Sequence, residues 1–326
     1  MTKARVVSLS KLGGAEVIEV IDKELPSPGK GEVQIRQTAI GFNFIDIYQR
    51  SGYYPLDLPT GLGHEAVGVV EALGDGVTGL KVGDRVMYMN AGIGAYASAR
   101  NVAADKLVPV PNNVADEVAA AVFFKAMTAQ YLIQKTYKVK AGDIVLVHAA
   151  AGGVGQILAG WAKALGAFVV GSVGSQAKVA VAKAAGCDAV VDYSQPNWVE
   201  EFLKATGGKK ANVVYDSVAK TTFMGSLDCV APFGTLALFG AASGPAPEIQ
   251  PEILNKKGCL FLTRPSVFPH NATHALLQEN AKAVFDAIAK GYVKVQIAAK
   301  FPLEQAAEAH RAAEGRKLSG AIIMIP

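Results

Sequence analysis

The sequence contains few cysteines, and their spacing excludes two classes of protein. The cysteines, Cys187, Cys229 and Cys259, are odd in number and lie far apart along the chain. They supply neither the paired framework of a small disulfide-rich domain nor the C-x-x-C knuckle of a zinc module. This cysteine usage fits a protein of a reducing compartment.

The chain also lacks long apolar runs and clusters of like charge. The N-terminal residues MTKARVV contain no hydrophobic signal region, and the apolar stretches near 118–124 and 144–151 are too short to cross a membrane. The net charge is only +4, and basic residues occur as pairs such as Lys209-Lys210. Because binding to duplex DNA needs an extended basic surface, we expect a cytoplasmic protein that binds neither DNA nor a membrane.

Apolar residues and glycine, by contrast, are abundant. Hydrophobic residues make up 51% of the chain and charged residues 18%, and there are 34 glycines. This balance excludes a disordered chain and favours a well-buried α/β enzyme. A chain of 326 residues is too long for one typical core and suits two domains.

The first 125 residues are predicted to be mostly β. The runs ARVVSL, AEVIEVID, GEVQIRQTAI, EAVGVVEAL and DRVMYM are rich in β-forming residues. They are separated by turn signals such as LGG at 12–14, PSPG at 26–29 and GDG at 74–76. This region shows no helical crossover rhythm, so we expect a mainly β domain.

From about residue 125 the pattern alternates between β-type and helical segments. Six apolar runs follow one another: DIVLVHAA, AFVVGSV, AVVDY, ANVVYDSV, TLALFGAA and CLFLTRP. Such alternation predicts parallel strands with right-handed crossovers, a doubly wound six-stranded Rossmann domain over residues 126–265. Two helical stretches and a last strand, AIIMIP, follow. We expect them to return to the first domain, so that residues 1–125 and 266–326 form one discontinuous domain.

A glycine-rich loop follows the first of these six runs. Ala150 and Ala151 lead into Gly152, Gly153, Val154 and Gly155, and a helical stretch begins there. Gly152 would let the backbone approach a pyrophosphate, and Gly155 would let the helix pack close to the strand. Ala150 replaces the first glycine of the usual fingerprint. The order of strand, loop and helix still predicts a dinucleotide site, with a ligand-free turn as the alternative.

The end of the second run predicts which dinucleotide binds. NAD sites carry an acidic residue there for the ribose hydroxyl, whereas this sequence has Ser172, Gly174 and Ser175, followed by Lys178. Hydroxyls and an ammonium suit a 2′-phosphate, so we expect NADPH. An ordinary solvated lysine is the alternative for Lys178. Tyr193, after the third run, is predicted to cover the adenosine, with edge packing as the alternative.

Several motifs together resemble the medium-chain dehydrogenase/reductase superfamily. They are Gly63-His64-Glu65 with Gly68, Gly83-Asp84-Arg85-Val86 and the glycine-rich loop, and the match runs nearly end to end. Further motifs are similar to the NADPH:quinone oxidoreductases, the zeta-crystallin-like group: Asn43-Phe44-Ile45-Asp46, Arg50-Ser51-Gly52, Tyr215-Asp216-Ser217-Val218, Leu254-Asn255 and Thr263-Arg264-Pro265-Ser266. The resemblance implies a mostly β GroES-like catalytic domain beside the Rossmann domain.

The resemblance also predicts that no metal is bound. Zinc-dependent members use Cys, His, Glu and Cys, but here Asn43 and Phe124 stand at the two cysteine positions, beside His64 and Glu65 at the middle ones. An amide and a phenyl ring leave too few ligands for zinc. His64 is then expected to be a buried, hydrogen-bonded residue, with proton transfer as the alternative role.

Without a metal, the expected reaction is reduction of an electron-poor acceptor by NADPH. The resemblance implies a quinone as substrate, with family members described as passing single electrons to give semiquinones. The pocket would use Asn43, Asp46, Tyr48 and Tyr54 as catalytic residues, and Asn43, Thr128, Phe239 and Arg264 beside the cofactor. Packing is the alternative role for the tyrosines, and a structural hydrogen bond is the alternative for Asp46.

The resemblance further implies a homodimer through the Rossmann edge strand near CLFLTRP, since an exposed apolar edge invites pairing. A loop covering that edge is the alternative. Two other functions stay open. An enone or alkenal double-bond reductase would use the same zinc-free scaffold, and a nucleotide- or RNA-binding structural protein would belong to another class.

Overall fold

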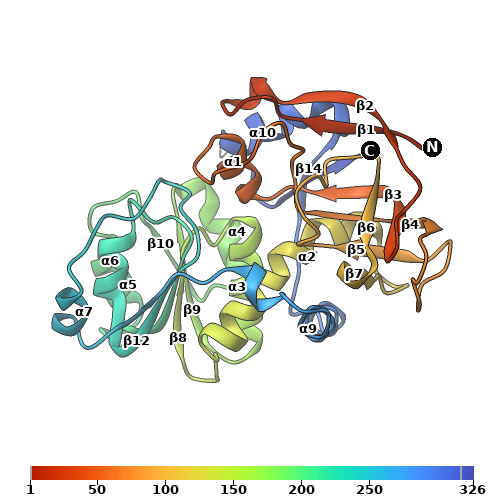
Figure 1. Cartoon of the computed structure of the whole chain (residues 1–326). Helices are drawn as coiled ribbons and strands as arrows, with labels where there is room; N and C mark the ends of the chain where they lie inside the picture. The colour runs from red at the N-terminus through yellow and green to blue at the C-terminus, as the bar shows by residue number, and fades with distance from the viewer. Residues whose placement is uncertain (1, 316–317) are drawn as a thin grey trace. The chain divides into compact units, whose positions relative to one another are not determined.

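The protein is described by a computed structural model over residues 2–315 and 318–326 (Figure 1). It divides into two compact units. Unit 1 comprises Met1–Lys125, Asn271–Lys282 and Val295–Pro326, and unit 2 comprises Ala126–His270 and Ala283–Lys294. Relative to the predicted boundary, residues 266–270 and 283–294 therefore group with unit 2.

Unit 1 is built on mainly antiparallel strands. They are β1 (Thr2–Ser8), β2 (Glu19–Leu25), β3 (Glu32–Gly41), β4 (Glu65–Leu73), β5 (Arg85–Tyr88), β6 (Ala99–Ala103), β7 (Leu107–Pro109), β14 (Ile297–Pro302) and β15 (Ala321–Ile325). The order in the larger sheet is β14-β15-β3-β4-β5-β7, with β6 also paired to β3, while β1 and β2 form a separate pair. The run AIIMIP does return to unit 1, where β15 pairs with β3.

Short helices complete unit 1. They are α1 (Phe44–Arg50), α10 (Ala306–Glu314) and the 3-10 turns at Ala15–Val17, Ala104–Lys106 and Leu303–Gln305. The helix α10 buries Ala306, Ala309 and Ala313 in one hydrophobic cluster with residues of β3 and β4. Two longer helices, α2 (Asp116–Tyr131) and α9 (His274–Ala289), belong partly to each unit.

Unit 2 contains a six-stranded parallel sheet, which confirms that prediction. Its strands are β8 (Ile144–Val147), β9 (Phe168–Val173), β10 (Ala189–Asp192), β11 (Ala211–Asp216), β12 (Val230–Leu238) and β13 (Phe261–Thr263). The strand order is β10-β9-β8-β11-β12-β13. The chain therefore runs outward from β8 through β9 to β10 and then crosses back to β11, on the other side of β8.

Helices cover both faces of this sheet. They are α3 (Gly153–Ala164), α4 (Val179–Ala184), α5 (Trp198–Ala205), α6 (Phe223–Cys229), α7 (Glu252–Lys256), α8 (Val267–His270), a 3-10 turn (Gln176–Lys178) and a π-helical turn (Leu132–Thr136). Right-handed crossovers in opposite directions place α3 and α4 on one face and α5 and α6 on the other, as Figure 1 shows. The reversal creates a switch point beside β8, where ligands of such sheets bind.

The helices of the described residues are too short or too polar to span a bilayer. Across residues 2–315 and 318–326, none combines the length and the apolar character needed to cross a membrane.

Candidate functional site

The predicted cofactor residues of unit 2 gather at one edge of its sheet. The glycine-rich loop follows β8, Gly174 and Ser175 follow β9, Tyr193 follows β10, Phe239 follows β12 and Arg264 follows β13. Carboxyl ends of neighbouring parallel strands lie at the same edge. Residues up to about 110 positions apart in the sequence thus face one region, as the topology requires.

The loop after β8 has the backbone geometry of a phosphate cradle. Gly152 caps the N-terminus of α3 with φ of −81° and ψ of 171°, and the first N–H groups of a helix have no acceptor within it. A Cβ on Gly155 would lie 2.2 Å from the carbonyl oxygen of Ala149, so that close approach requires glycine. Ala149, not Ala150, carries the left-handed backbone of the turn, at φ of 50°. This arrangement fits a pyrophosphate.

The loop after β9 offers polar groups without a carboxylate. Ser175 precedes a 3-10 turn in which the Lys178 N–H donates to the Ser175 carbonyl at 3.1 Å. A Cβ on Gly174 would lie 2.7 Å from the hydroxyl of Tyr193, so Tyr193 packs directly on this glycine. The structure therefore brings Gly174, Ser175 and Tyr193 together, and Lys178 follows within one turn.

Ser172 lies elsewhere, and its predicted role needs correction. Its side chain is fully buried, and its hydroxyl lies 2.6 Å from Nδ1 of His148. Nε2 of His148 contacts Ser226, whose hydroxyl donates to Asp216. Because Ser226 gives its proton to Asp216, His148 donates from Nε2 and accepts from Ser172 at Nδ1. The Ser172 hydroxyl is thus committed to the interior and cannot serve a 2′-phosphate.

The three remaining cofactor candidates are also placed in unit 2. Arg264 is exposed, and its Nη1 donates to the carbonyl of Leu238 at 2.9 Å, at the end of β12. The Phe239 N–H donates to the carbonyl of Asp216, at the end of β11. Thr128 is buried on α2. Phe239 and Arg264 are therefore held at the carboxyl edge by the strands they follow.

In unit 1, Asn43 stands at the start of α1 and is only 6% exposed. Its backbone N–H donates to Oδ2 of Asp46 at 2.9 Å, which is one half of a helix capping box. Its side-chain Nδ2 donates to Oε1 of Glu65 at 2.8 Å, and its Oδ1 accepts from Nζ of Lys125 at 3.1 Å. Hydrogen bonds at both Nδ2 and Oδ1 therefore fix the orientation of the Asn43 amide.

Asp46 is fully buried on the same helix. Besides Asn43, its Oδ2 accepts the hydroxyl of Tyr96 at 2.7 Å, whereas its Oδ1 has no hydrogen-bond partner among the described residues. Burial raises the pKa of Asp46 to about 7, although the bonds from Asn43 and Tyr96 act in the opposite direction. The carboxyl can consequently exist in both protonation states near neutral pH.

Tyr48 and Tyr54 belong to a cluster of three tyrosines. The ring of Tyr48 lies 5.5 Å from those of Tyr53 and Tyr54, both nearly edge-on, and the rings of Tyr53 and Tyr54 are 5.1 Å apart. Tyr53 was not predicted as a site residue, although it directly precedes Tyr54 in the sequence. The cluster joins Tyr48 of α1 to two tyrosines of the segment that follows the helix.

The two middle positions of the expected zinc-ligand set, His64 and Glu65, are buried and make hydrogen bonds to other residues of unit 1. His64 is buried, with Nε2 at 3.0 Å from Oε1 of Gln49, and burial lowers the pKa of His64 to about 4. Glu65 accepts the Phe124 N–H at 2.7 Å in addition to Asn43. Lys125, which the sequence analysis missed, lies 3.6 Å from Glu65. A lysine directly after the apolar run 118–124 is the signal that could have revealed it.

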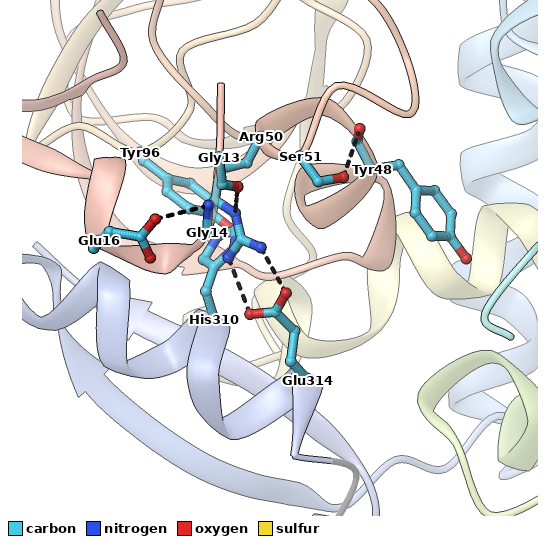
Figure 2. A network of polar contacts seen from close by, with 9 residues as sticks. All are labelled: Gly13, Gly14, Glu16, Tyr48, Arg50, Ser51, Tyr96, His310 and Glu314. Atoms are coloured by element: carbon cyan, nitrogen blue, oxygen red, sulfur yellow. Dashed lines mark hydrogen bonds and ion pairs between the residues drawn. The ribbon is translucent and has the colours of Figure 1, made fainter. Parts of the chain in front are cut away.

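A second buried network holds the far end of α1. Figure 2 shows Arg50 reaching toward His310 and Glu314 of α10. Arg50 is 1% exposed, and its guanidinium pairs with both carboxylate oxygens of Glu314, at 2.6 and 3.1 Å. Its Nη1 also lies 3.2 Å from Nδ1 of His310, and Nε2 of His310 lies 3.4 Å from the hydroxyl of Tyr96. Both ends of α1 are therefore tied into one set of contacts.

Two family models match this chain, one over part of unit 1 and one mainly over unit 2. Residues 29–112 match the alcohol dehydrogenase GroES-like domain, and residues 153–290 match the zinc-binding dehydrogenase family. A quinone oxidoreductase of Pseudomonas aeruginosa is 44% identical over 99% of this chain and 100% of its own length. A 2-haloacrylate reductase of Burkholderia is 42% identical over 98% of both chains.

Solved structures give the same result. The Escherichia coli quinone oxidoreductase complexed with NADPH superposes with a TM-score of 0.96 and 43% identity, over 99% of this chain and 100% of that one. These matches define a two-domain dehydrogenase/reductase with a GroES-like domain and a Rossmann domain, which confirms the predicted fold class. Within that class, the chain belongs to the quinone oxidoreductases of the zinc-binding dehydrogenase family.

His310 predicts a pH dependence of stability. Burial, with help from Arg50, lowers the pKa of His310 to about 3, below its ordinary value of 6.5. Between these pH values the unfolded chain binds a proton at this site that the folded chain does not, so stability falls as the pH falls below 6.5. In His310→Gln this loss should disappear, because glutamine does not titrate.

Urea unfolding at pH 7 and pH 4.5 measures this effect. The free energy of unfolding should fall by about 2 kcal/mol more in the wild type than in His310→Gln. Other groups contribute equally to both proteins and cancel in the comparison. Parallel pH profiles would show that His310 titrates normally in the folded state.

Proposed function

We propose that this protein catalyses the reduction of quinones by NADPH, as its quinone oxidoreductase relatives are named for doing. The observation that carries the proposal lies at the carboxyl ends of the strands of unit 2. There the loop after β9 supplies Ser175 and Lys178 and no carboxylate. Full-length identity of 44% to a quinone oxidoreductase supports the same activity. Unit 2 then serves as the cofactor domain and unit 1 as the catalytic domain.

Each part of the cofactor has residues that suit it. The N–H groups of Gly153, Val154 and Gly155 would bind the pyrophosphate, and Ser175 and Lys178 would bind the 2′-phosphate. Tyr193 would cover the adenosine from its place on Gly174. Phe239 and Arg264, held at the ends of β12 and β13, would flank the cofactor beyond the pyrophosphate, with Thr128. When bound, NADPH supplies the electrons for the reduction.

The residues of unit 1 would hold the electron acceptor. The Asn43 amide would donate a hydrogen bond to the acceptor carbonyl, where negative charge develops during reduction. Tyr48 and Tyr54 would offer ring faces to a flat quinone and hydroxyl groups at its margin. Asp46 would hold the start of α1 through the Asn43 N–H, and any exchange of its own proton would use Oδ1.

A second candidate substrate class is favoured by one observation. The relative from Burkholderia that is 42% identical over nearly the whole chain is named a 2-haloacrylate reductase, and a 2-haloacrylate is an activated alkene. An activated alkene and a quinone both need a donor for a developing oxyanion. The same Asn43 amide would therefore serve either substrate.

Initial rates of NADPH oxidation test the assignment. We expect faster turnover with a para-quinone than with an α,β-unsaturated ketone, and faster turnover with NADPH than with NADH. Protein stripped of metal by a chelator should be as active as untreated protein. Faster reduction of the unsaturated ketone would assign the protein to the double-bond reductases, and no turnover of either acceptor would refute both assignments.

The selection of NADPH should depend on Lys178. Replacing this ammonium with a carboxylate in Lys178→Glu should weaken NADPH binding about a hundredfold and NADH binding by less than about threefold. The matched control is Ser172→Ala, which should leave the preference between the two cofactors unchanged, since that hydroxyl is bound to His148. Fluorescence titrations give both affinities, and equal losses for the two cofactors in Lys178→Glu would remove Lys178 from the 2′-phosphate site.

We also propose a homodimer formed through β13. In the described part of the chain this strand pairs only with β12, and it ends the sheet of unit 2. Phe261 on β13 is 62% exposed and Phe233 on β12 is 72% exposed, which is unusual for phenylalanine. Pairing of two β13 edges across a two-fold axis would cover both residues and satisfy the free backbone groups of the edge.

Sedimentation measures the dimer directly. The wild type should sediment at twice the chain mass, and Phe261→Asp should shift it toward the monomer. Val82→Asp is the matched control, because Val82 has the same exposed fraction of 62% but lies in unit 1. A monomeric wild type, or a dimer that survives Phe261→Asp with undiminished affinity, contradicts pairing through this edge.

The cellular location is likewise a proposal. Cys187 and Cys229 are buried free thiols, as expected for a protein of the reducing cytoplasm.

A further inference from the structure

The side chain of Lys125 is buried among oxygen atoms of unit 1. It is 6% exposed, and its Nζ lies 2.8 Å from the carbonyl of Phe42, 3.1 Å from Oδ1 of Asn43 and 3.6 Å from Oε1 of Glu65. The ammonium therefore donates hydrogen bonds to Phe42 and Asn43 and forms an ion pair with Glu65. Burial lowers the pKa of the Lys125 amine, and the neighbouring carboxylates of Glu65 and Asp46 oppose that shift.

Stability alone does not account for this pair of charges. Removing two opposite charges from water costs about as much as their attraction returns, and apolar residues of similar volume are often equally stabilising. Residues 119–124 of the same helix are in fact all apolar and buried. Lys125 and Glu65 share one neighbour, the side-chain amide of Asn43, and both charges act on that amide.

The two charges determine which way the Asn43 amide faces. Lys125 can only donate and Glu65, when ionised, can only accept, so Oδ1 must face the ammonium and Nδ2 the carboxylate. A rotation of the amide by 180° would place its NH₂ against the ammonium and its oxygen against the carboxylate. One N–H of Nδ2 donates to Glu65, and within residues 2–315 and 318–326 the second meets no acceptor, which leaves it as a donor of fixed direction.

We infer that Lys125 and Glu65 are positioning residues that fix the Asn43 amide, so that its second N–H is preorganised for the carbonyl oxygen of the acceptor. The inference rests on the proposed role of Asn43 in quinone reduction. Donation from Lys125 to Oδ1 also polarises the amide and strengthens its N–H groups as donors. Preorganised donors of this kind act on the transition state more than on binding.

Four full-length proteins test the inference: wild type, Lys125→Met, Glu65→Gln and the double variant. Each single substitution leaves one buried charge unpaired and should lower the melting temperature. The double variant removes both charges and should recover most of that loss. Its kcat for a para-quinone should nevertheless stay at least about tenfold below wild type, while the KM for NADPH changes by less than about twofold.

Two controls separate positioning from folding. Arg85→Met with Asp116→Asn removes another ion pair of the same helix and should leave kcat within about twofold of wild type. In an Asn43→Ala background, Lys125→Met with Glu65→Gln should cause no further loss of kcat, because the amide they position is gone.

The outcomes are distinguishable. A double variant with wild-type kcat, or a full additional loss in the Asn43→Ala background, overturns the positioning role while quinone turnover by the wild type keeps the proposed function intact. A wild type that turns over no quinone overturns the proposed function itself, and the inference falls with it.

Discussion

The interior of unit 1 contains charges that must satisfy one another, and the position of α1 follows from that constraint. Asp46, Glu65, Arg50 and Lys125 are all almost fully buried. An unpaired buried charge would cost several kcal/mol, so each must meet a partner of fixed geometry. The partners come from the start and end of α1, from β4, from α2 and from α10. The short helix is consequently located by polar contacts as much as by its apolar face.

In unit 2, hydroxyl groups donate hydrogen bonds to the buried carboxyl group of Asp216. The chain of contacts from Ser172 through His148 and Ser226 to Asp216 ties β9, the residue after β8, α6 and the end of β11 to one another. Asp216 also accepts the N–H groups of Val218 and Ala219, which shapes the loop after β11. Buried hydrogen bonds therefore hold the carboxyl ends of β8, β9 and β11 in place. The glycines of the loop after β8 leave its backbone N–H groups accessible to a phosphate.

The parallel sheet and its nucleotide loop could be predicted because their signals are local. Apolar runs of strand length, turn residues between them and the glycine spacing are each visible within a few residues. The helix α2 was not predicted, because residues 119–131 are buried on every side and leave no amphipathic period. Ser172 was misassigned because its inward orientation depends on His148, 24 residues away. Lys125 and Tyr96 acquire their roles only through contacts distant in the sequence.

The contact between Arg50 and His310 has a consequence for proton transfer to Asp46. With the guanidinium donating to Nδ1, the neutral ring carries its hydrogen on Nε2 and the hydroxyl of Tyr96 points to Asp46. The series of donors thus leads in one direction, from the buried Arg50 through His310 and Tyr96 to the buried Asp46. Arginine, however, does not release its proton in proteins. Because its first donor cannot release a proton, the series fixes the direction of these hydrogen bonds and delivers no proton to Asp46.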